Sequence, residues 1–545
     1  MFPKKVMVSP LPLKASMADR FRNFISRLEE SRIGFELWIA AALSIIFMRD
    51  SLECLVTAGS FPIADLFHLF HVPIFFSSLL LTVILLLHFF SGEEITKVSK
   101  VSLIFFAIIL LPVLMDFFIS LAVKREVVYQ YIEEDAGKNF IQFLNPFLRL
   151  SQVPFSLRIE VAGITLLSFI YIHLKKSKIF LSLIGAFFVF VSCVLYGAIP
   201  AVLTGLISSF FRFLIFLSKF IYLNIPPKLT GIVDERVVVI TQLLFTSVLI
   251  AIWYSRYDGE KFRALWRNLR WARVFHYILL VMMGVALYFY DVRETDIFLV
   301  IKILGITLAM FFACQFCAVA NDIFDTDCDR LSNKDRPLIA GTLEKYEYLR
   351  VGFVYLALAL CFAVWVSDRC FMVILVFMAL YFIYSAPPFR LKRFYPLNPL
   401  IIGIEAVLAF LLGQVSLAPT EFLVSFYPSI LGLLFAIFFL SSHIKDLKDM
   451  EGDKSCQILT LPVMLGVDRG RLVTGGFVLL SYLLAPFLFY SVFTHWFIFV
   501  LALVFGTANF VYIRRRDAQE RFIFGTYLVF GMTLLSFLIQ AVFFS

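Results

Sequence analysis

An apolar run and an acidic cluster adjoin at residues 297–330, which read IFLVIKILGITLAMFFACQFCAVA followed directly by NDIFDTDCDR. The apolar part contains a single charged residue, Lys302. About 20 such residues cross the hydrocarbon core of a bilayer as an α-helix. The stretch therefore predicts a membrane-spanning helix that ends, at one membrane surface, in a group of aspartates.

Similar apolar runs recur along the chain, and the composition agrees with them. Of the 545 residues, 61% are hydrophobic and only 16% are charged, and the mean hydropathy is +0.91. Soluble globular proteins use about 45–50% apolar and about 25% charged residues, so that class is excluded. The sequence lacks the alternation typical of membrane β-barrels, and a bilayer tolerates no open backbone. We therefore predict an all-α polytopic membrane protein.

A basic linker divides the chain into two predicted domains. Residues 256–273 contain six basic residues and two tryptophans, which are typical of the membrane interface. We place the boundary there, with a multi-helix membrane domain of unrecognised role at residues 1–270 and a second domain at residues 271–545. The second domain is predicted to contain nine helices, near residues 274–290, 297–320, 347–366, 371–384, 397–415, 423–442, 472–490, 497–513 and 522–543.

The first domain contains seven apolar segments of uneven length. They lie near residues 34–48, 72–91, 101–123, 161–174, 178–206, 207–224 and 236–254. If the basic N-terminal tail and the basic linker both lie in the cytoplasm, the number of crossings between them is even. One of the seven segments is then interfacial, re-entrant or merged with its neighbour.

Alternate loops of the second domain differ in charge, which predicts its orientation. One set is long and rich in charged residues, as at 321–346 and 443–471. The other set is short and nearly free of Lys and Arg, near residues 291–296, 367–370, 416–422 and 491–496. The positive-inside rule places the charged set in the cytoplasm. We expect an integral multi-pass protein of the cell inner membrane with its acidic clusters on the cytoplasmic side.

Two polar clusters with one spacing stand at the cytoplasmic ends of the second and sixth of these helices. The first consists of Asn321, Asp322, Asp325 and Asp329. The second consists of Asp446, Asp449 and Asp453. In each cluster the aspartates follow at i, i+3 and i+7, so in a continuous helix they would share one face. The sequence thus predicts two acidic faces on one side of the membrane.

Two such faces need a compensating cation. Like charges at this spacing repel each other, and ionisable groups near the hydrocarbon boundary are costly. Oxygen ligands without nearby Cys or His favour Mg²⁺, which typically binds through one or two carboxylates together with substrate phosphates. A diphosphate is the ligand that this arrangement predicts, because bound metal would neutralise it as a leaving group.

Basic residues flank both clusters and suit phosphate binding. They are Arg330, Lys334 and Arg336 after the first cluster, Lys445, Lys448 and Lys454 around the second, and Arg390, Lys392 and Arg393 in a loop between the two. Each of them could equally serve only as a topology signal, because the positive-inside rule fills cytoplasmic loops with such residues.

The eight cysteines show no paired framework, so we predict no disulfides. Cys314 and Cys317 form a CxxC, but it lies inside an apolar run, where packing is the better interpretation.

The residues around the two clusters resemble the motifs of a known family. Residues 321–341, NDIFDTDCDRLSNKDRPLIAG, resemble the first aspartate-rich motif of the UbiA-type intramembrane prenyltransferases, NDxxDxxxDR followed by RPL and Gly. Residues 446–466, DLKDMEGDKSCQILTLPVMLG, resemble their second motif. Residues 384–393, YSAPPFRLKR, are similar to the loop between them in the branch with chlorophyll synthases and homogentisate prenyltransferases. The resemblance covers residues 271–545.

The resemblance implies a nine-helix bundle and a role for each motif residue. The implied Mg²⁺ ligands are Asn321, Asp322, Asp325, Asp329, Asp446, Asp449 and Asp453. The implied ligands of the substrate diphosphate are Asn321, Arg330, Arg336, Tyr384, Arg390, Lys392 and Lys454. Among all of these, catalysis is expected to depend most on Asp322, Asp325, Lys392, Asp446 and Asp449.

Two departures from the family pattern stand out. A glycine common in the second motif is Gln457 here, which affects the local loop geometry. The tyrosine and lysine of the intermediate loop, Tyr384 and Lys392, do not have the YxxxK spacing of the ubiquinone branch, which weakens the case for a 4-hydroxybenzoate acceptor.

The expected function is Mg²⁺-dependent transfer of a polyprenyl group from a polyprenyl diphosphate to a lipophilic or aromatic acceptor within the bilayer, without a nucleic-acid partner. Two alternatives stay open. An ion-coupled transporter could use the acidic clusters, although carrier sites lie near the bilayer midplane and both clusters here lie at helix ends. A prenyl-diphosphate cyclase or lyase could use the same metal site.

Overall fold

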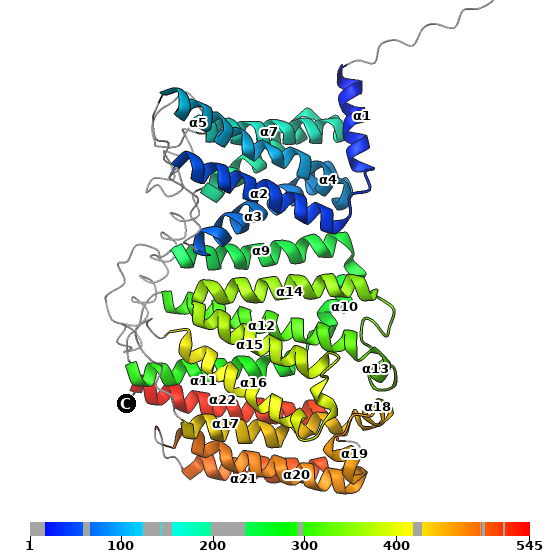
Figure 1. Cartoon of the computed structure of the whole chain (residues 1–545), viewed down its shortest axis with the longest axis vertical. Helices are drawn as coiled ribbons and strands as arrows, with labels where there is room; N and C mark the ends of the chain where they lie inside the picture. The colour runs from blue at the N-terminus through cyan, green and yellow to red at the C-terminus, as the bar shows by residue number, and fades with distance from the viewer. Residues whose placement is uncertain are drawn as a thin grey trace, which may run out of the picture. The chain divides into compact units, whose positions relative to one another are not determined.

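The computed structural model describes residues 17–57, 66–123, 143, 155–197, 235–292, 298–417, 428–490, 492, 496–515 and 518–544. These residues are almost entirely helical (Figure 1). Fourteen described helices are long and apolar enough to cross a membrane, judged by length and composition. Nine of them lie in residues 271–545, which confirms the predicted nine-helix bundle.

The chain forms two compact units. The first comprises Met1–Tyr222 and Leu244–Asp258, and the second comprises Leu223–Leu243 and Gly259–Ser545. Helix α9, Glu235–Tyr257, therefore contributes its first residues to the second unit and the remainder to the first.

The first unit is built from apolar helices around its own core. Its helices are α1 (Met17–Glu29), α2 (Phe35–Thr57), α3 (Leu66–Ser91), α4 (Ile95–Phe106), η1 (Ala107–Ile109), α5 (Leu110–Val123), α7 (Phe155–Lys176) and Ile179–Gly197. The predicted segment 207–224 lies outside the described residues. Helix α2 covers the predicted segment 34–48 but is not among the fourteen candidate spans, and it carries four charged residues.

An ion pair is buried inside the first unit. Arg49 of α2 is completely buried, and its Nη1 donates to Oε2 of Glu160 on α7 at 2.9 Å. Its Nε lies 3.8 Å from Oε2 of Glu53, and its guanidinium stands 4.6 Å from the ring centre of Phe76. The pair links α2 to α7 inside the unit, where an unpaired charge would be costly.

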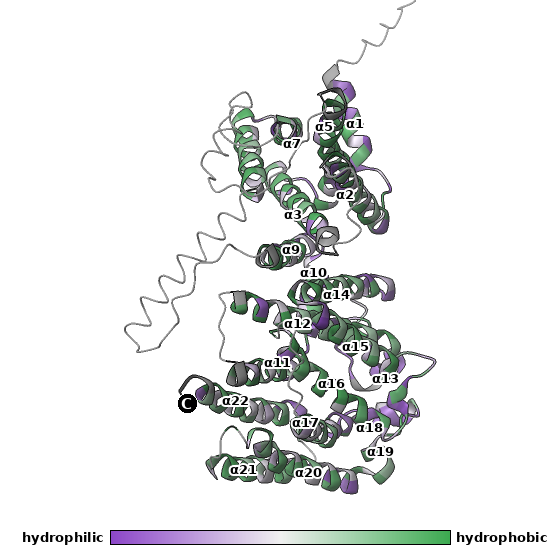
Figure 2. Cartoon of the chain, turned by 60° about the vertical axis from the view of Figure 1, so that its left-hand side comes forward, coloured by the Kyte–Doolittle hydropathy of each residue, from purple (hydrophilic) through white to green (hydrophobic). Residues whose placement is uncertain are grey.

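The second unit contains the two aspartate motifs. Its helices are α10 (Gly259–Asn268), α11 (Trp271–Val292), α12 (Phe298–Phe324), α13 (Thr326–Ser332), α14 (Lys345–Val366), α15 (Asp368–Ser385), η2 (Leu391–Arg393), α16 (Leu397–Val415), α17 (Pro428–Ser441), η3 (Ser442–Leu447), α18 (Met450–Ser455), α19 (Leu461–Leu465), α20 (Val467–Leu484), η4 (Ala485–Phe489), α21 (Trp496–Ile513) and α22 (Glu520–Phe544). Figure 2 shows hydrophilic residues gathered around the short helices α13 and α18, while the long helices are mostly hydrophobic.

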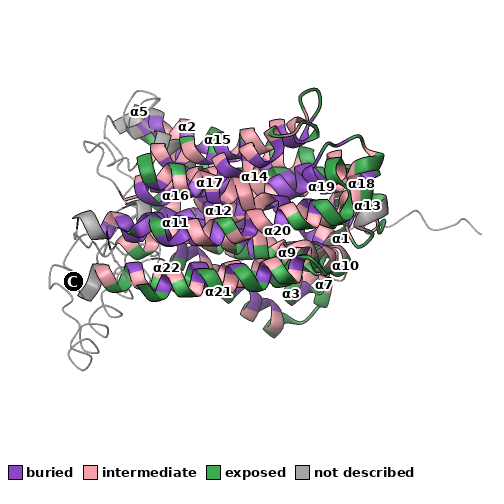
Figure 3. Cartoon of the chain, turned by 90° about the horizontal axis from the view of Figure 1, so that it is seen from below, coloured by how far each residue is buried: buried purple, intermediate pink, exposed green. Residues whose placement is uncertain are grey.

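Helices α11, α12 and α16 form the centre of the second unit. Figure 3 shows buried residues concentrated in these helices, whereas α21 and α22 are more exposed. Glycines allow α11 and α16 to pack unusually closely. A Cβ at Gly284 would lie 2.1 Å from the Phe410 carbonyl oxygen, and one at Gly413 would lie 2.1 Å from that of Val281. Small residues permit such backbone contact between membrane helices, and here they hold the polar residues of α11 against α16.

Candidate active site

The two aspartate motifs meet at one polar cavity of about 80 Å³ in the second unit. The first motif occupies the end of α12 and α13, and the second occupies η3 and α18. The cavity is lined by Asn321, Asp325, Asp329, Asp446, Asp449 and Asp453, together with Arg270, Arg273, Arg336, Tyr384, Lys392 and Lys445. Six of the seven predicted metal ligands therefore converge, and the seventh, Asp322, lies behind them.

Asp322 is an anchor between helices. Arg336 Nη1 lies 2.9 Å from its Oδ1, and Arg270 forms an ion pair with the same oxygen. Its Oδ2 accepts hydrogen bonds from Asn268 Nδ2 at 3.1 Å and from the Tyr348 hydroxyl at 3.0 Å. Both carboxylate oxygens are thus occupied by groups from α10, α14 and the adjoining loops. Asp322 therefore does not line the cavity with the other aspartates, although Arg336 joins it to Asp329.

The reason is a break in the helix. Helix α12 ends at Phe324 and α13 begins at Thr326, with Asp325 between them at φ −104° and ψ 10°. The Asp325 N–H still donates to the Asn321 carbonyl at 2.9 Å, so the axis continues although the helix is interrupted. Asp325 consequently pairs with Arg390 and Lys392, whereas Asp322 and Asp329 share Arg336.

Asp325 is neutralised from the loop between the motifs. Its Oδ1 accepts a hydrogen bond from Arg390 Nη2 at 3.0 Å, and its Oδ2 accepts one from Lys392 Nζ. Lys392 is 5% exposed, and this burial lowers its pKa to about 8, although the Asp325 carboxylate opposes the shift. Lys392 is therefore a desolvated cation at the cavity wall, a setting in which it binds an anion strongly.

The second motif lacks such compensation. Asp446 lies in the 3₁₀ turn η3, Asp449 directly precedes α18 and Asp453 lies within it, so the predicted continuous helix was wrong here too. Asp446 Oδ2 accepts a hydrogen bond from Asn398 at 3.5 Å. Among the described residues, no Lys or Arg nitrogen lies within 4.0 Å of these three carboxylates. Burial, with repulsion from Asp446 and Asp449, raises the pKa of Asp453 to about 8.

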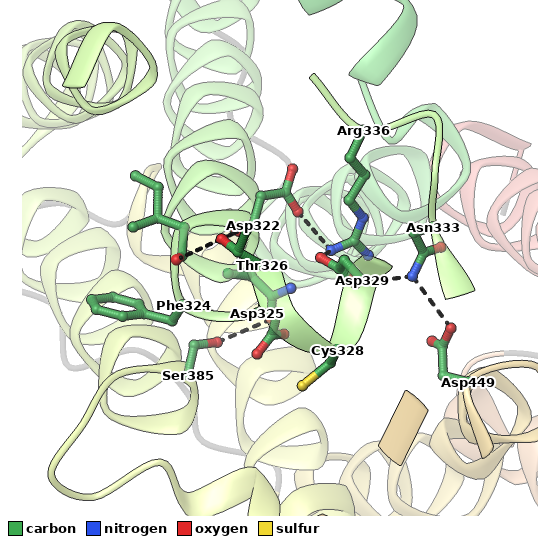
Figure 4. A network of polar contacts seen from close by, with 12 residues as sticks. Asp322, Phe324, Asp325, Thr326, Cys328, Asp329, Asn333, Arg336, Ser385 and Asp449 are labelled. Atoms are coloured by element: carbon green, nitrogen blue, oxygen red, sulfur yellow. Dashed lines mark hydrogen bonds and ion pairs between the residues drawn. The ribbon is translucent and has the colours of Figure 1, made fainter. Parts of the chain in front are cut away.

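Two links join the motifs directly. Asn333 Nδ2 donates to Asp329 Oδ1 at 3.0 Å and to Asp449 Oδ1 at 3.5 Å, as Figure 4 shows. Cys328 and Cys456 form a disulfide with a Cα–Cα distance of 6.0 Å. The expectation of no disulfides was therefore wrong. These cysteines lie 128 residues apart in the sequence, so their pairing becomes visible only once the motifs are brought together.

The donors around the cavity suit Mg²⁺ held jointly with a phosphate ligand. They are carboxylate and amide oxygens, which Mg²⁺ prefers to nitrogen or sulfur. Within the part of the chain that the structure describes, no three His, Cys, Asp or Glu side chains are grouped closely enough to hold an ion by themselves. Mg²⁺ commonly keeps water and takes only one or two carboxylates when substrate phosphates complete its shell. The residues therefore fit a metal–diphosphate pair better than an all-protein cage.

The predicted phosphate ligands fall into two groups. Arg336, Tyr384 and Lys392 line the cavity, and Arg390 reaches Asp325 at its edge. The Arg330 side chain, by contrast, is 69% exposed and lies 3.9 Å from Asp327, and Lys454 is also exposed. Both lie on the outer sides of short helices and do not line the cavity.

A chain of polar contacts connects Tyr384 to the second motif. Lys445 Nζ donates to the Tyr384 hydroxyl at 2.6 Å, and that hydroxyl donates to Asn398 Oδ1 at 3.0 Å. Asn398 in turn contacts Asp446, as described above. Lys392 Nζ stands 6.0 Å from the centre of the Tyr384 ring, so these two residues meet although the YxxxK spacing is absent.

Sequence reasoning missed several residues of the site. Arg270 and Arg273 were taken as topology signals of the basic linker, yet both line the cavity. Their position at the start of an apolar run was the one available signal, because a cation there lies at the membrane surface. Asn333 and Asn398 carried no signal, since a single asparagine in a loop or helix predicts no partner.

An apolar cavity of about 140 Å³ adjoins the polar one. It lies among α11, α12, α15, α16, α17 and α22, and most of its exposed surface is apolar. The two cavities share Arg270, Arg273, Tyr381, Tyr384 and Lys445. The combined site can thus hold a molecule with a polyanionic head and an apolar tail.

Comparisons with known proteins agree on one family. The UbiA prenyltransferase family model matches residues 277–530. Digeranylgeranylglyceryl phosphate synthase of Methanocaldococcus jannaschii is 24% identical over 252 residues, which cover 45% of this chain and 85% of that enzyme. Chloroplastic 2-acylphloroglucinol 4-prenyltransferase of Humulus lupulus is 30% identical over 193 residues, covering 33% of this chain and 45% of that enzyme. The chain thus spans about half the length of the hop enzyme.

A solved structure shows a likeness over about half of the chain. The UbiA homolog from Archaeoglobus fulgidus bound to GPP and Mg²⁺ is 19% identical, with a TM-score of 0.41. The match covers 51% of this chain and 99% of that protein.

Proposed function

We propose that the domain at residues 277–530, which matches the UbiA prenyltransferase family model, transfers a polyprenyl group from a polyprenyl diphosphate, held with Mg²⁺, to a lipophilic acceptor in the bilayer. The observation that carries this proposal is that the two cavities share five lining residues, while one is otherwise lined by aspartates and cations and the other mainly by apolar side chains. The diphosphate would occupy the first and the prenyl chain the second.

The relatives' names leave the acceptor open. The archaeal relative is named as a digeranylgeranylglyceryl phosphate synthase and the hop relative as a prenyltransferase of 2-acylphloroglucinol. These names describe different acceptors, so the acceptor of this chain has to be inferred from its own residues.

Cationic side chains would bind the diphosphate oxygens. Arg336 and Lys392 project into the polar cavity, and Lys445 stands where the two cavities meet. Arginine suits bidentate phosphate contacts and lysine acts as a point charge. The aspartates that line the cavity would hold Mg²⁺ together with the diphosphate, and the metal would supply Lewis-acid neutralisation of the leaving group. The protein positions these charges before the reaction, so little reorganisation is needed as negative charge develops.

Aromatic and apolar walls would protect the reacting prenyl carbon. Tyr381 and Tyr384 line both cavities, with ring centres 5.5 Å apart. Tyrosine faces stabilise a nearby cation by about 0.5–2 kcal/mol. Phe377 and Phe438 continue the wall into the apolar cavity. Such a lining keeps water away from an allylic cation, so that the acceptor rather than water captures it.

We further propose that the protein lies in the cell inner membrane and that its site faces the cytoplasm. Support comes from the charged loops, which lie on the side of the two motifs. The acidic motifs lie at helix ends rather than at the midplane, which favours an enzyme at the membrane surface over an ion-coupled transporter.

Charge removal at the cavity tests the proposal. Asp325→Asn and Asp449→Asn should each reduce transfer from labelled geranylgeranyl diphosphate into membrane lipid on the order of 10²–10³-fold, the loss typical of a missing electrostatic stabiliser. Asp327→Asn is the matched control, because this aspartate belongs to the same segment but is 88% exposed and lies outside the cavity. Equal activity of all three variants and the wild type would refute the proposed function.

A further inference from the structure

One carboxyl group lies in the wall of the apolar cavity, away from the aspartate motifs. Glu405 of α16 is 1% exposed and lines this cavity. Its Oε2 accepts a hydrogen bond from the Tyr277 hydroxyl of α11 at 2.9 Å. Its Oε1 is buried and has no hydrogen-bond partner in the described structure. The carboxyl group therefore has one oxygen occupied and one free.

The position of Glu405 relates it to the diphosphate site. Asn398, seven residues earlier on α16, lines the polar cavity and contacts Asp446. Residues at i and i+7 share a helix face and lie roughly 10 Å apart along the axis. One face of α16 thus carries Asn398 at the polar cavity and Glu405 at the apolar cavity. A group bound at Glu405 would therefore lie deeper in the membrane than the diphosphate.

Packing alone does not explain this residue. A carboxyl group inside the bilayer is costly unless its oxygens have partners. The side chains around the cavity include Phe377, Ile437 and Phe438, so an apolar residue at position 405 would fit the surroundings. Buried polar groups in proteins are nearly always hydrogen-bonded. An unpartnered buried oxygen on a residue that lines a cavity is the place where a ligand would supply the missing hydrogen-bond donor.

We infer that Glu405, oriented by Tyr277, binds the acceptor of the proposed prenyl transfer, that the acceptor attacks through a hydroxyl group, and that Glu405 takes the hydroxyl proton. This inference rests on the proposed function. The C1–O bond of the prenyl diphosphate breaks, and its electron pair leaves with the diphosphate. A bond forms between C1 and the acceptor's hydroxyl oxygen, and the proton moves from that oxygen to Glu405 Oε1. The product is a prenyl ether, and the proton passes to water when the product leaves.

Tyr277 has a positioning role within this pair. Its hydroxyl donates to Oε2, which fixes the carboxyl group and leaves Oε1 without a partner. The close contact of α11 and α16 at Gly284 and Gly413 holds the two side chains at this distance. The acceptor's hydroxyl would therefore meet a carboxylate oxygen whose orientation is already fixed.

The test uses the full-length protein in phosphatidylcholine nanodiscs with Mg²⁺, labelled geranylgeranyl diphosphate as donor and a total lipid extract of the source membranes as acceptor. Glu405→Gln keeps the shape of the side chain but cannot take a proton at physiological pH. It should lower kcat on the order of 10²-fold or more, as expected for a lost general base. The KM for the donor should change by less than about twofold, because the cations that bind phosphate are untouched.

Tyr277→Phe should raise the KM for the lipid extract by about fivefold to tenfold, because Glu405 loses the hydrogen bond that orients it toward the acceptor. Tyr482→Phe is its control, since Tyr482 is a buried, hydrogen-bonded tyrosine of the same unit that does not line the cavity. The purified labelled product should contain a new C–O bond by NMR.

Several outcomes would overturn the inference. Full kcat of Glu405→Gln would leave the residue with only a structural role, and a product joined through carbon would exclude attack by a hydroxyl oxygen. Loss of donor affinity in Glu405→Gln would place the residue at the diphosphate instead. If the wild type and Asp449→Asn incorporate equal label, the proposed function itself fails and the inference with it. If the wild type incorporates label and Asp449→Asn does not, the proposed function holds. Full kcat of Glu405→Gln would then count against the inference alone.

Discussion

The two aspartate motifs contain the same kind of side chain in opposite electrostatic settings. In the first motif, Asp322 pairs with Arg270 and Arg336, and Asp325 pairs with two cations of the intermediate loop. In the second motif, no carboxylate of the described structure has a Lys or Arg nitrogen within salt-bridge distance. The protein thus balances the charge of one motif itself and leaves the other to an added cation.

This difference separates stability from ligand binding. A buried carboxylate that is paired with cations contributes to the folded state mainly because removing it would leave those cations uncompensated. A buried carboxylate without a cation is a cost to the folded state and becomes useful only when a metal binds. We therefore expect substitutions in the first motif to affect folding, and those in the second to affect metal and substrate binding.

The largest effect on stability is expected for Asp322→Asn. The substitution leaves Arg270 without its carboxylate partner and Arg336 with Asp329 alone, and breaking a buried ion pair costs about 3–5 kcal/mol. Asp453→Asn, in metal-free buffer, should leave stability unchanged or raise it, because it removes a carboxyl that its neighbours repel. Denaturant unfolding in detergent with EDTA measures both. An equal loss of stability in the two variants would contradict the comparison.

The disulfide between the motifs is expected to have the next largest effect. Cys328 and Cys456 close a loop of more than 100 residues, and a disulfide of this kind typically stabilises the folded state by about 2–4 kcal/mol. Cys328→Ser should lose this amount under oxidising conditions and nothing after reduction with dithiothreitol. Cys361→Ala, which removes a free cysteine, is the control. If wild type and Cys328→Ser unfold alike in oxidising buffer, the motifs are not cross-linked.

The sequence predicted the helices and the meeting of the motifs, because both depend on repeating patterns. Apolar runs of sufficient length predict helices, and aspartates at two helix ends on one membrane side can be brought together. The orientation of each carboxylate could not be predicted, because it depends on the break at Asp325 and the 3₁₀ turn around Asp446. A helical wheel assumes one continuous α-helix, so it includes neither the break nor the 3₁₀ turn.

Contacts between residues far apart in the chain could also not be predicted from the sequence. Glu405 is one charged residue in an apolar run, and its partner Tyr277 lies 128 residues earlier. Arg270 resembled any other cation of a cytoplasmic linker until the fold placed it beside Asp322. Such pairs depend on helix packing, and a single sequence contains no periodic signal for them.

A smaller effect is expected in the pH dependence of Mg²⁺ binding. Burial and the neighbouring carboxylates raise the pKa of Asp453 to about 8, so at pH 7 this group is mostly protonated in the absence of metal. Mg²⁺ needs the carboxylate and displaces the proton. The affinity for Mg²⁺ should therefore rise by up to about tenfold per pH unit below pH 8 and level off above it. Isothermal titration calorimetry in buffers of different ionisation enthalpy measures the released proton.

The raised pKa of Asp453 also affects the stability of the folded protein without Mg²⁺. An unfolded aspartate ionises near pH 4, so between about pH 4 and pH 8 the folded protein binds more protons than the unfolded chain. Metal-free stability should consequently fall as pH rises through this range. Asp453→Asn should remove both slopes, whereas Asp327→Asn, which changes an exposed aspartate, should retain them. Unchanged slopes in Asp453→Asn would assign the titration to another group.

The smallest predicted effect concerns the backbone beside each motif. A residue with positive φ follows both of them, Gly341 at φ 70° after the first and Gln457 at φ 56° after the second. Glycine adopts this conformation freely, while other L-residues lose roughly 1–2 kcal/mol in it. Gln457→Gly should therefore stabilise the protein by less than about 1 kcal/mol, because the greater freedom of glycine in the unfolded chain offsets part of the gain. The opposite exchange, Gly341→Gln, should destabilise it by about 1–2 kcal/mol, and a stabilising Gly341→Gln would show that the two turns are not equivalent.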